Sequence, residues 1–176
     1  MTSDYYANYA EEFCRETLSL DMGEIRSRFI HYLPSKAIIL DAGCGSGRDT
    51  VAFKEMGYSV VAFDASPEIA RIASRVTGQE VMPIGFEDLE FKEDFDGVWA
   101  CASLLHVPRE DLPSALEKLV RALKPGGYLY MSFKEGRTER VDDKGRFFQD
   151  LDKEGLDQLL LEVTDLEIIE WWTTKD

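Results

Sequence analysis

Residues 38–49 read IILDAGCGSGRD, an apolar run that reaches an acid and is followed by three glycines at alternate positions. A short apolar run closed by glycine is typical of a buried parallel strand that enters a tight turn. A helical pattern begins after the glycines, and its free N–H groups and positive dipole end would face that turn. The stretch therefore predicts a strand–turn–helix unit that binds a nucleotide-like or zwitterionic ligand.

A second strand supports this interpretation. Residues 60–64 read VVAFD, another buried-type strand that ends in a carboxylate. A carboxylate about 20 residues past the turn suits a bidentate bond to ribose hydroxyls. Residues 66–68 supply an N-cap serine, a proline at the first helical position and an acid in the first turn. The next helix therefore starts just after Asp64 and holds this residue at the carboxyl end of its strand.

The spacing of the glycines separates two classes of ligand. A dinucleotide fingerprint, G-x-G-x-x-G, would require its third glycine at the position of Arg48. The sequence instead has D-x-G-x-G-x-G from Asp41 to Gly47, which resembles the first motif of the class I S-adenosylmethionine-dependent methyltransferases. The LKPGG of residues 123–127 resembles that family too. The resemblance covers roughly residues 37–133.

The expected fold is α/β, a doubly wound and mostly parallel sheet with helices on both faces, Rossmann-like as in that family. Periodicity and turn signals predict strands at 37–41, 59–63, 80–84, 95–101, 128–133 and 167–172, and helices at 4–18, 22–33, 48–56, 67–76, 109–124 and 153–161. Residues 134–146 are expected to be a surface loop. The family's sheet usually ends in a hairpin, and only four residues follow 172, so this hairpin is expected to be truncated or its last strand to lie in an unusual place.

The length of 176 residues predicts one domain. Within it, residues 1–34 would form amino-terminal helices that act as a lid, 37–133 the cofactor-binding core, and 134–176 a carboxyl-terminal helix and strand. The apolar residues of the last strand would leave an exposed edge, which predicts a homodimer through that end.

The resemblance also implies which residues contact the cofactor. Tyr9 is the candidate from the lid helix, and Arg48 would reach the cofactor carboxylate or else lie in solvent. In the family an acid after the third strand accepts from the adenine amino group. Gly85 fills its usual position here, which leaves Glu87 and Asp88 as rivals. The full set of expected cofactor contacts is Tyr9, Asp41, Gly43, Cys44, Gly45, Gly47, Arg48, Asp64, Ala65, Glu87, Asp88 and Cys101.

One residue is a candidate general base. His106 follows the strand at 95–101, where the reacting methyl group is expected, and its ordinary pKa suits proton removal near neutrality. The alternative is a histidine that orders the following loop by hydrogen bonds. Methyl transfer from a sulfonium is largely a matter of positioning and desolvation, so a base is often unnecessary.

Charge and cysteine content limit the partners. The chain has 34 acidic and 20 basic residues, a net charge of −14, which disfavours nucleic acid and membrane surfaces as partners. The three cysteines lack metal-ligand spacing, so no metal site is expected, and reduced thiols would suit a cytoplasmic location.

Together these features predict an S-adenosylmethionine-dependent methyltransferase that acts on a small-molecule acceptor. The alternative is a non-catalytic module that binds the same cofactor or has a regulatory role. A nicotinamide oxidoreductase is a third hypothesis. Arg48 argues against it, because the dinucleotide fingerprint requires its third glycine at this position.

Overall fold

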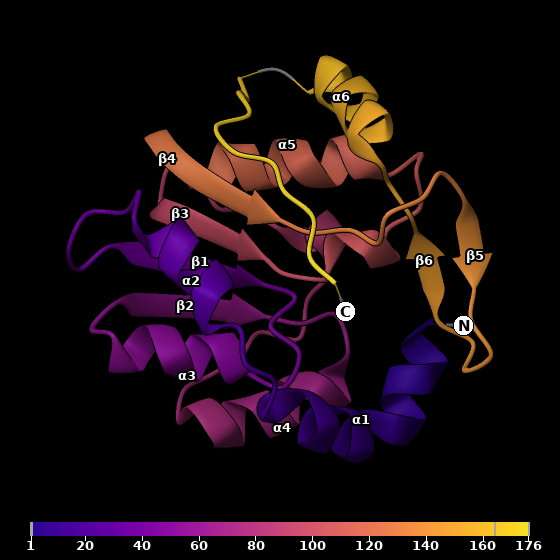
Figure 1. Cartoon of the computed structure of the whole chain (residues 1–176). Helices are drawn as coiled ribbons and strands as arrows, with labels where there is room; N and C mark the ends of the chain where they lie inside the picture. Colours follow the sequence, from indigo (N-terminus) through magenta and orange to yellow (C-terminus); the bar gives the residue numbers. More distant parts are fainter. Residues whose placement is uncertain (1, 164, 176) are drawn as a thin grey trace.

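The computed structural model describes residues 2–163 and 165–175. A central parallel sheet carries helices on both sides, and a small hairpin and a last helix follow (Figure 1). The elements are α1 (Thr2–Leu18), α2 (Gly23–Ile30), β1 (Ile38–Ala42), α3 (Arg48–Glu55), β2 (Ser59–Phe63), α4 (Pro67–Thr77), the 3-10 turn η1 (Phe86–Asp88), β3 (Phe95–Ala100), the 3-10 turn η2 (Leu104–His106), α5 (Leu112–Ala122), β4 (Leu123–Met131), β5 (Glu139–Val141), β6 (Phe147–Gln149) and α6 (Lys153–Glu162).

The sheet order places a ligand crevice beside the first strand. The four strands run in the order β2-β1-β3-β4, and every neighbouring pair is parallel. The chain steps from β1 to β2 on one side and later returns to β3 on the other side. In sheets of this kind the crevice lies outside the carboxyl ends of the strands at this point of reversal. The doubly wound parallel sheet expected from the sequence is confirmed.

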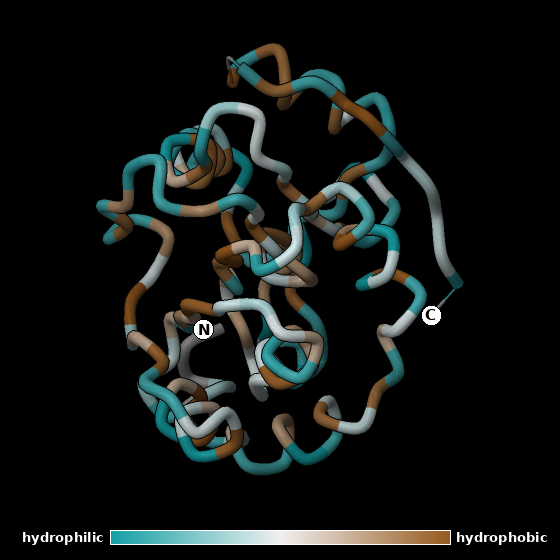
Figure 2. The backbone as a smooth tube through the Cα atoms, turned by 90° about the vertical axis from the view of Figure 1, so that its left-hand side faces the viewer, coloured by the Kyte–Doolittle hydropathy of each residue, from teal (hydrophilic) through white to brown (hydrophobic). Residues whose placement is uncertain are grey.

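Alternation along the strands produces two hydrophobic layers. On one face, Ile39 packs with Phe29 of α2 and Phe53 of α3, whereas on the other face Leu40 packs with leucines of α5. Figure 1 shows α2 and α5 on opposite sides of the sheet. The hydropathy view places hydrophobic strand segments at the centre and spreads hydrophilic residues over the outer helices and loops (Figure 2). Because both faces are covered, the strands of the sheet consist mainly of apolar residues.

Side chains cap the first turn of two helices. The hydroxyl of Ser66 accepts a hydrogen bond from the backbone N–H of Ile69 at 3.3 Å and caps α4. The carboxylate of Asp152 accepts from the N–H of Gly155 at 2.9 Å and caps α6. The first of these caps fixes the start of α4 immediately after the loop that contains Asp64.

Three expectations about strands are wrong. Residues 80–84 are not a strand of the sheet, and only an isolated parallel bridge joins Met82 to Phe63. Residues 134–146 are not wholly a loop, because β5 lies within them and pairs antiparallel with β6. Residues 167–172 form no strand, and their contacts come from side chains, with Trp172 stacked 6.0 Å from Tyr130. The homodimer expected through that end therefore loses the strand edge on which it depended.

Helix α1 lies beside the carboxyl edge of the sheet and contains a break. Tyr9 has the non-helical angles φ −123° and ψ 19°, so the helix consists of two segments that meet there. The second segment packs Ala10 and Cys14 against Ile69 of α4. The first segment reaches the turn between β5 and β6, where the guanidinium of Arg146 lies 5.2 Å from the ring centre of Tyr5. Among the described residues, no helix is long and apolar enough to cross a bilayer.

Candidate functional site

The turn after β1 has a backbone geometry that favours glycine. Gly43, Gly45 and Gly47 have φ values of 74°, 54° and 80°, a region that residues with a Cβ rarely adopt. Space is also restricted, because a Cβ on Gly43 would lie 2.5 Å from the Cβ of Ser103. The N–H of Gly43 donates to the carbonyl of Phe63 at 3.0 Å, which ties the turn to the end of β2. The three glycines thus bend the chain tightly at the sheet's carboxyl edge.

Asp64 connects this turn to the next loop. Its Oδ2 accepts from the N–H of Gly45 at 2.9 Å, and its Oδ1 accepts from the N–H of Ser66 at 3.0 Å. Burial raises the pKa of Asp64 to about 6, although both backbone hydrogen bonds favour the charged form. Each oxygen keeps a second lone pair, and the carboxylate borders the cavity described next.

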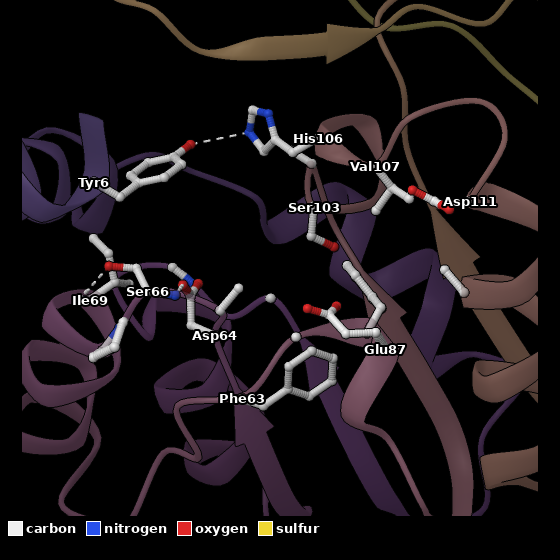
Figure 3. A pocket seen from close by; sticks show the side chains of 18 of the residues that line it. Tyr6, Phe63, Asp64, Ser66, Ile69, Glu87, Ser103, His106, Val107 and Asp111 are labelled. Carbon is white, nitrogen blue, oxygen red and sulfur yellow. Dashed lines mark hydrogen bonds between the residues drawn. The ribbon is translucent and has the colours of Figure 1, made fainter. Parts of the chain in front are cut away.

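A cavity of about 750 Å³ opens over the carboxyl edge of the sheet (Figure 3). This volume lies within the range of about 300–1,000 Å³ that is usual for ligand sites. Five segments form its wall: α1, the glycine turn, the loop from β2 into α4, η1 and the chain from β3 to α5. Its lining residues are Tyr6, Phe13, Gly43, Gly45, Phe63, Asp64, Ala65, Ser66, Pro67, Glu68, Ile69, Gly85, Phe86, Glu87, Ala102, Ser103, His106, Val107, Pro108, Asp111, Ser114 and Ala115.

A tyrosine–histidine pair crosses one end of the cavity. Nδ1 of His106 lies 2.6 Å from the carbonyl oxygen of Phe147 in β6, and Nε2 lies 3.1 Å from the hydroxyl of Tyr6 in α1. A carbonyl only accepts, so Nδ1 carries the proton and Nε2 accepts from the tyrosine hydroxyl. Burial lowers the pKa of His106 and raises the pKa of Tyr6 to about 12. Both side chains are therefore neutral near pH 7.

The charged residues that line the cavity are all acidic. They are Asp64, Glu68, Glu87 and Asp111, and no lysine or arginine belongs to the set. Such a lining attracts cations and repels anions, and the attraction is stronger in a partly enclosed space than in open water.

The structure brings only some of the expected cofactor contacts to the cavity. Those that line it are Gly43, Gly45, Asp64, Ala65 and Glu87, together with the candidate base His106. Those that do not line it are Tyr9, Asp41, Cys44, Gly47, Arg48, Asp88 and Cys101. Glu87 and Asp88 were rivals at the sequence level, and only Glu87 reaches the cavity.

Two of the residues outside the cavity lining have clear structural roles. Asp41 is buried beneath the turn and accepts from the hydroxyl of Thr50 at 2.5 Å, which anchors α3. The guanidinium of Arg48 turns back to the carboxylate of Asp49, with Nη2 and Oδ2 2.7 Å apart. Asp49 also accepts from Nε1 of Trp99, so Arg48 completes a buried polar network instead of entering the cavity.

Tyr9 lies outside the cavity lining because α1 breaks at that residue. Its side chain is 51% exposed, whereas Tyr6 and Phe13 line the cavity. Phe13 approaches the glycine turn, since a Cβ on Gly45 would lie 3.5 Å from its ring. Helical spacing could have suggested Tyr6 and Phe13 as one face, but no motif singles them out. No motif singles out Ser103 either.

Comparison with known proteins agrees with this geometry. A family model described as "Methyltransferase domain" matches residues 40–131, just over half of the chain. The chain is 36% identical over 110 residues to a tRNA (carboxymethyluridine(34)-5-O)-methyltransferase of Arabidopsis thaliana, covering 59% of this chain and 26% of that protein. It is 31% identical over 106 residues to a ubiquinone biosynthesis O-methyltransferase of Xanthomonas axonopodis, covering 56% of this chain and 44% of that one. The chain thus spans less than half the length of these curated relatives.

Solved structures share the fold. A Burkholderia thailandensis 1,6-didemethyltoxoflavin-N1-methyltransferase, solved with 1,6-didemethyltoxoflavin and S-adenosylhomocysteine, matches with a TM-score of 0.67 and 24% identity, over 92% of this chain and 78% of that one. A SAM-dependent methyltransferase of Archaeoglobus fulgidus matches with a TM-score of 0.68 and 22% identity, over 90% and 73% of the two chains. These likenesses show that the chain has the Rossmann-like fold of S-adenosylmethionine-dependent methyltransferases. The chain belongs to the methyltransferase-domain family of class I S-adenosylmethionine-dependent enzymes.

Proposed function

We propose that this chain transfers a methyl group from S-adenosylmethionine to a small-molecule acceptor. The observation that carries the proposal is the position of Asp64. Its carboxylate and the three-glycine turn border one cavity at the switch point of the sheet. A carboxylate there suits the two ribose hydroxyls, and the turn suits the amino-acid end of the cofactor.

The rest of the cofactor would lie along η1. Phe86 and Glu87 both line the cavity, so the phenyl ring is available to pack on the adenine and the carboxylate to accept from the adenine amino group. Asp88 lies outside the lining, which supports Glu87 as the adenine acceptor. When bound, the cofactor supplies an electrophilic methyl group on a sulfonium. The contribution of the chain is then to hold the reactants in line and to exclude water.

The acceptor would approach from the end of the cavity where Tyr6 meets His106. In this arrangement α1 acts as a lid, through Tyr6 and Phe13 instead of the expected Tyr9. The lone pair of Nε2 already receives the hydroxyl proton of Tyr6. His106 can therefore accept a proton from a substrate only after that hydroxyl moves, and its present hydrogen bonds suit an orienting role.

The charges of the cavity support a small and non-anionic acceptor. The lining contains four carboxylates and no basic side chain, and the chain carries a net charge of −14. A polyanionic acceptor would have to approach against this field without the lysines and arginines that normally contact phosphates. The name of the Arabidopsis relative states a tRNA substrate, so RNA is the competing acceptor class that an experiment must include.

Calorimetry and a transfer assay test the proposal together. Titration with S-adenosylmethionine, S-adenosylhomocysteine and NAD should give heat with the first two ligands and none with NAD. Radiolabelled S-adenosylmethionine should then label compounds in a small-molecule acceptor panel but leave unlabelled a tRNA that carries carboxymethyluridine at position 34, the nucleoside in the name of the Arabidopsis relative. Heat with NAD alone would refute S-adenosylmethionine as the cofactor. Transfer to tRNA would refute the acceptor class, and binding without transfer to any acceptor would favour the non-catalytic module.

A further inference from the structure

One polar side chain in the cavity wall has no partner inside the protein. Ser103 is 8% exposed, and its Oγ makes no hydrogen bond within the described part of the chain. It lines the cavity, and in Figure 3 its hydroxyl points toward the interior of the cavity. Buried hydroxyls without a partner are rare because they lose their hydrogen bonds to water and gain none in return. This exception calls for a ligand atom as the missing partner.

The backbone before this serine is held in an unfavourable conformation. Ala102 has a φ of 51°, a left-handed geometry that a residue with a Cβ adopts only at a cost. The N–H of Ala102 donates to the hydroxyl of Ser132 at 2.8 Å, which fixes the bend. Strain of this kind gathers at ligand sites, where the surrounding structure maintains it. The bend immediately precedes Ser103 and determines how this residue leaves the end of β3.

Ser103 also lies against the first glycine of the turn. A Cβ placed on Gly43 would be 2.5 Å from the Cβ of Ser103 and 3.2 Å from its Oγ. Gly43 follows β1 and Ser103 follows β3, and these strands are adjacent in the sheet. The hydroxyl therefore stands in the crevice between the two strands, beside the turn. Asp64, by contrast, follows β2 on the other side of β1.

We propose that Ser103 is a cofactor-binding residue whose hydroxyl hydrogen-bonds the zwitterionic amino-acid end of S-adenosylmethionine. The inference rests on the proposed function, which places that end at the glycine turn and the ribose at Asp64. A serine hydroxyl can donate to the carboxylate or accept from the ammonium group, and either bond supplies its missing partner. The nucleoside end lies along Asp64 and η1, away from this hydroxyl.

The substitution Ser103→Ala separates this role from a structural one, because two measurements should move in opposite directions. The melting temperature of the ligand-free protein should rise, since the variant no longer buries an unpartnered hydroxyl. The affinity for S-adenosylhomocysteine, measured by calorimetry, should fall about tenfold, the effect of losing a hydrogen bond to a charged group. Ser103→Cys, which keeps the shape but hydrogen-bonds weakly, should lose affinity to a similar extent.

A truncated ligand assigns the contact to one end of the cofactor. 5′-Methylthioadenosine lacks the amino-acid group, so Ser103→Ala should leave its affinity unchanged. Ser59→Ala is the matched control, because Ser59 is exposed and lies outside the cavity lining, and neither affinity should change. Unaltered binding of S-adenosylhomocysteine by both Ser103 variants would refute the role, and an equal loss for both ligands would refute its assignment to the amino-acid end. Failure of the unmodified chain to bind either ligand would instead refute the proposed function on which the role rests.

Discussion

Asp64 is the residue on which cofactor affinity should depend most directly. Replacing it with alanine removes the proposed bonds to the ribose hydroxyls and leaves the N–H groups of Gly45 and Ser66 without their acceptor. We expect Asp64→Ala to weaken binding of S-adenosylhomocysteine by about 1.5–3 kcal/mol, the range for a lost charge-assisted hydrogen bond. Calorimetry at pH 7.5 measures this change directly.

The neighbouring acid Asp88 provides the control for that measurement. It lies outside the cavity lining, whereas Glu87 lies within it. Asp88→Ala should therefore leave affinity unchanged and Glu87→Ala should reduce it. A loss on substituting Asp88 with none on substituting Asp64 would contradict the site as described.

Asp41 and Asp49 should give opposite dependences of stability on pH. Burial raises the pKa of Asp41 to about 7, so its contribution to stability is complete below the unfolded pKa of 3.8 and is lost as pH rises through about 7. Asp41→Asn should thus gain stability relative to the unmodified protein by at most about 1.4 kcal/mol per pH unit over that window. The asparagine can still accept from Thr50.

Asp49 supplies the contrast within the same buried region. Burial opposes its ionisation, but hydrogen bonds from Arg48, Arg26 and Trp99 outweigh burial and lower its pKa. Its contribution is therefore present above pH 3.8 and lost as pH falls through the lowered folded value. Asp49→Asn should be destabilised at neutral pH, and the deficit should shrink in acid. Urea unfolding from about pH 2 to pH 8 spans both titrations and would show the two trends, and parallel trends would contradict this assignment.

At the scale of elements, the first segment of α1 and the β5–β6 hairpin meet over the cavity. Tyr6 contributes a hydrogen bond to His106, and Tyr5 lies under the guanidinium of Arg146. The break at Tyr9 divides these contacts from the packing of α1 on α4. The first segment can therefore separate from the hairpin without disturbing the second, which suits a lid.

Tyr6→Phe tests this lid. It removes one hydrogen bond worth about 0.5–1.5 kcal/mol, so S-adenosylhomocysteine should dissociate roughly 2–10 times faster. Tyr9→Phe makes the same change on the same helix, but at an exposed side chain, and should leave the rate unaltered. Stopped-flow fluorescence measures both rates. Equal rates in Tyr6→Phe and the unmodified protein would show that the hydroxyl does not hold the lid closed.

The elements that the sequence predicts best are those with strong local signals. The apolar composition of residues 38–42 predicts a buried strand, and the three glycines after it predict a tight turn. The N-cap residue Ser66 predicts where α4 begins. The hairpin was missed because β5 has three exposed residues and no apolar alternation. Residues 167–172 are rich in the β-branched and aromatic residues typical of strands, but pairing depends on a partner edge that local sequence cannot specify.

The site was predictable where one residue type was required by the backbone. The sequence predicts Gly43 and Asp64, which both line the cavity, because a tight turn and the proposed ribose contact each constrain the residue type. Tyr6 was missed in favour of Tyr9, because a break in α1 changes which tyrosine faces the cavity. Ser103 depends on the strained bend at Ala102, which no local pattern indicates.

At the scale of the whole molecule, charge should govern how the cofactor and its product arrive. The chain has a net charge of −14, and the charged residues that line the cavity are all acidic. S-Adenosylmethionine carries a sulfonium positive charge that S-adenosylhomocysteine lacks. The field of the protein should therefore accelerate association of the cofactor and have little effect on the neutral product.

The salt dependence of the association rates distinguishes this electrostatic steering from the short-range contacts of the bound ligand. Between about 10 mM and about 150 mM salt the Debye length shrinks from about 30 Å to about 8 Å, which screens long-range attraction. The association rate of S-adenosylmethionine should then fall several-fold while that of S-adenosylhomocysteine stays nearly constant, and both dissociation rates should change little. Stopped-flow measurements at the two salt concentrations supply all four rates. If both ligands slowed equally, the acidic cavity would have no part in selecting the charged form, and the argument against an anionic acceptor would lose its physical basis.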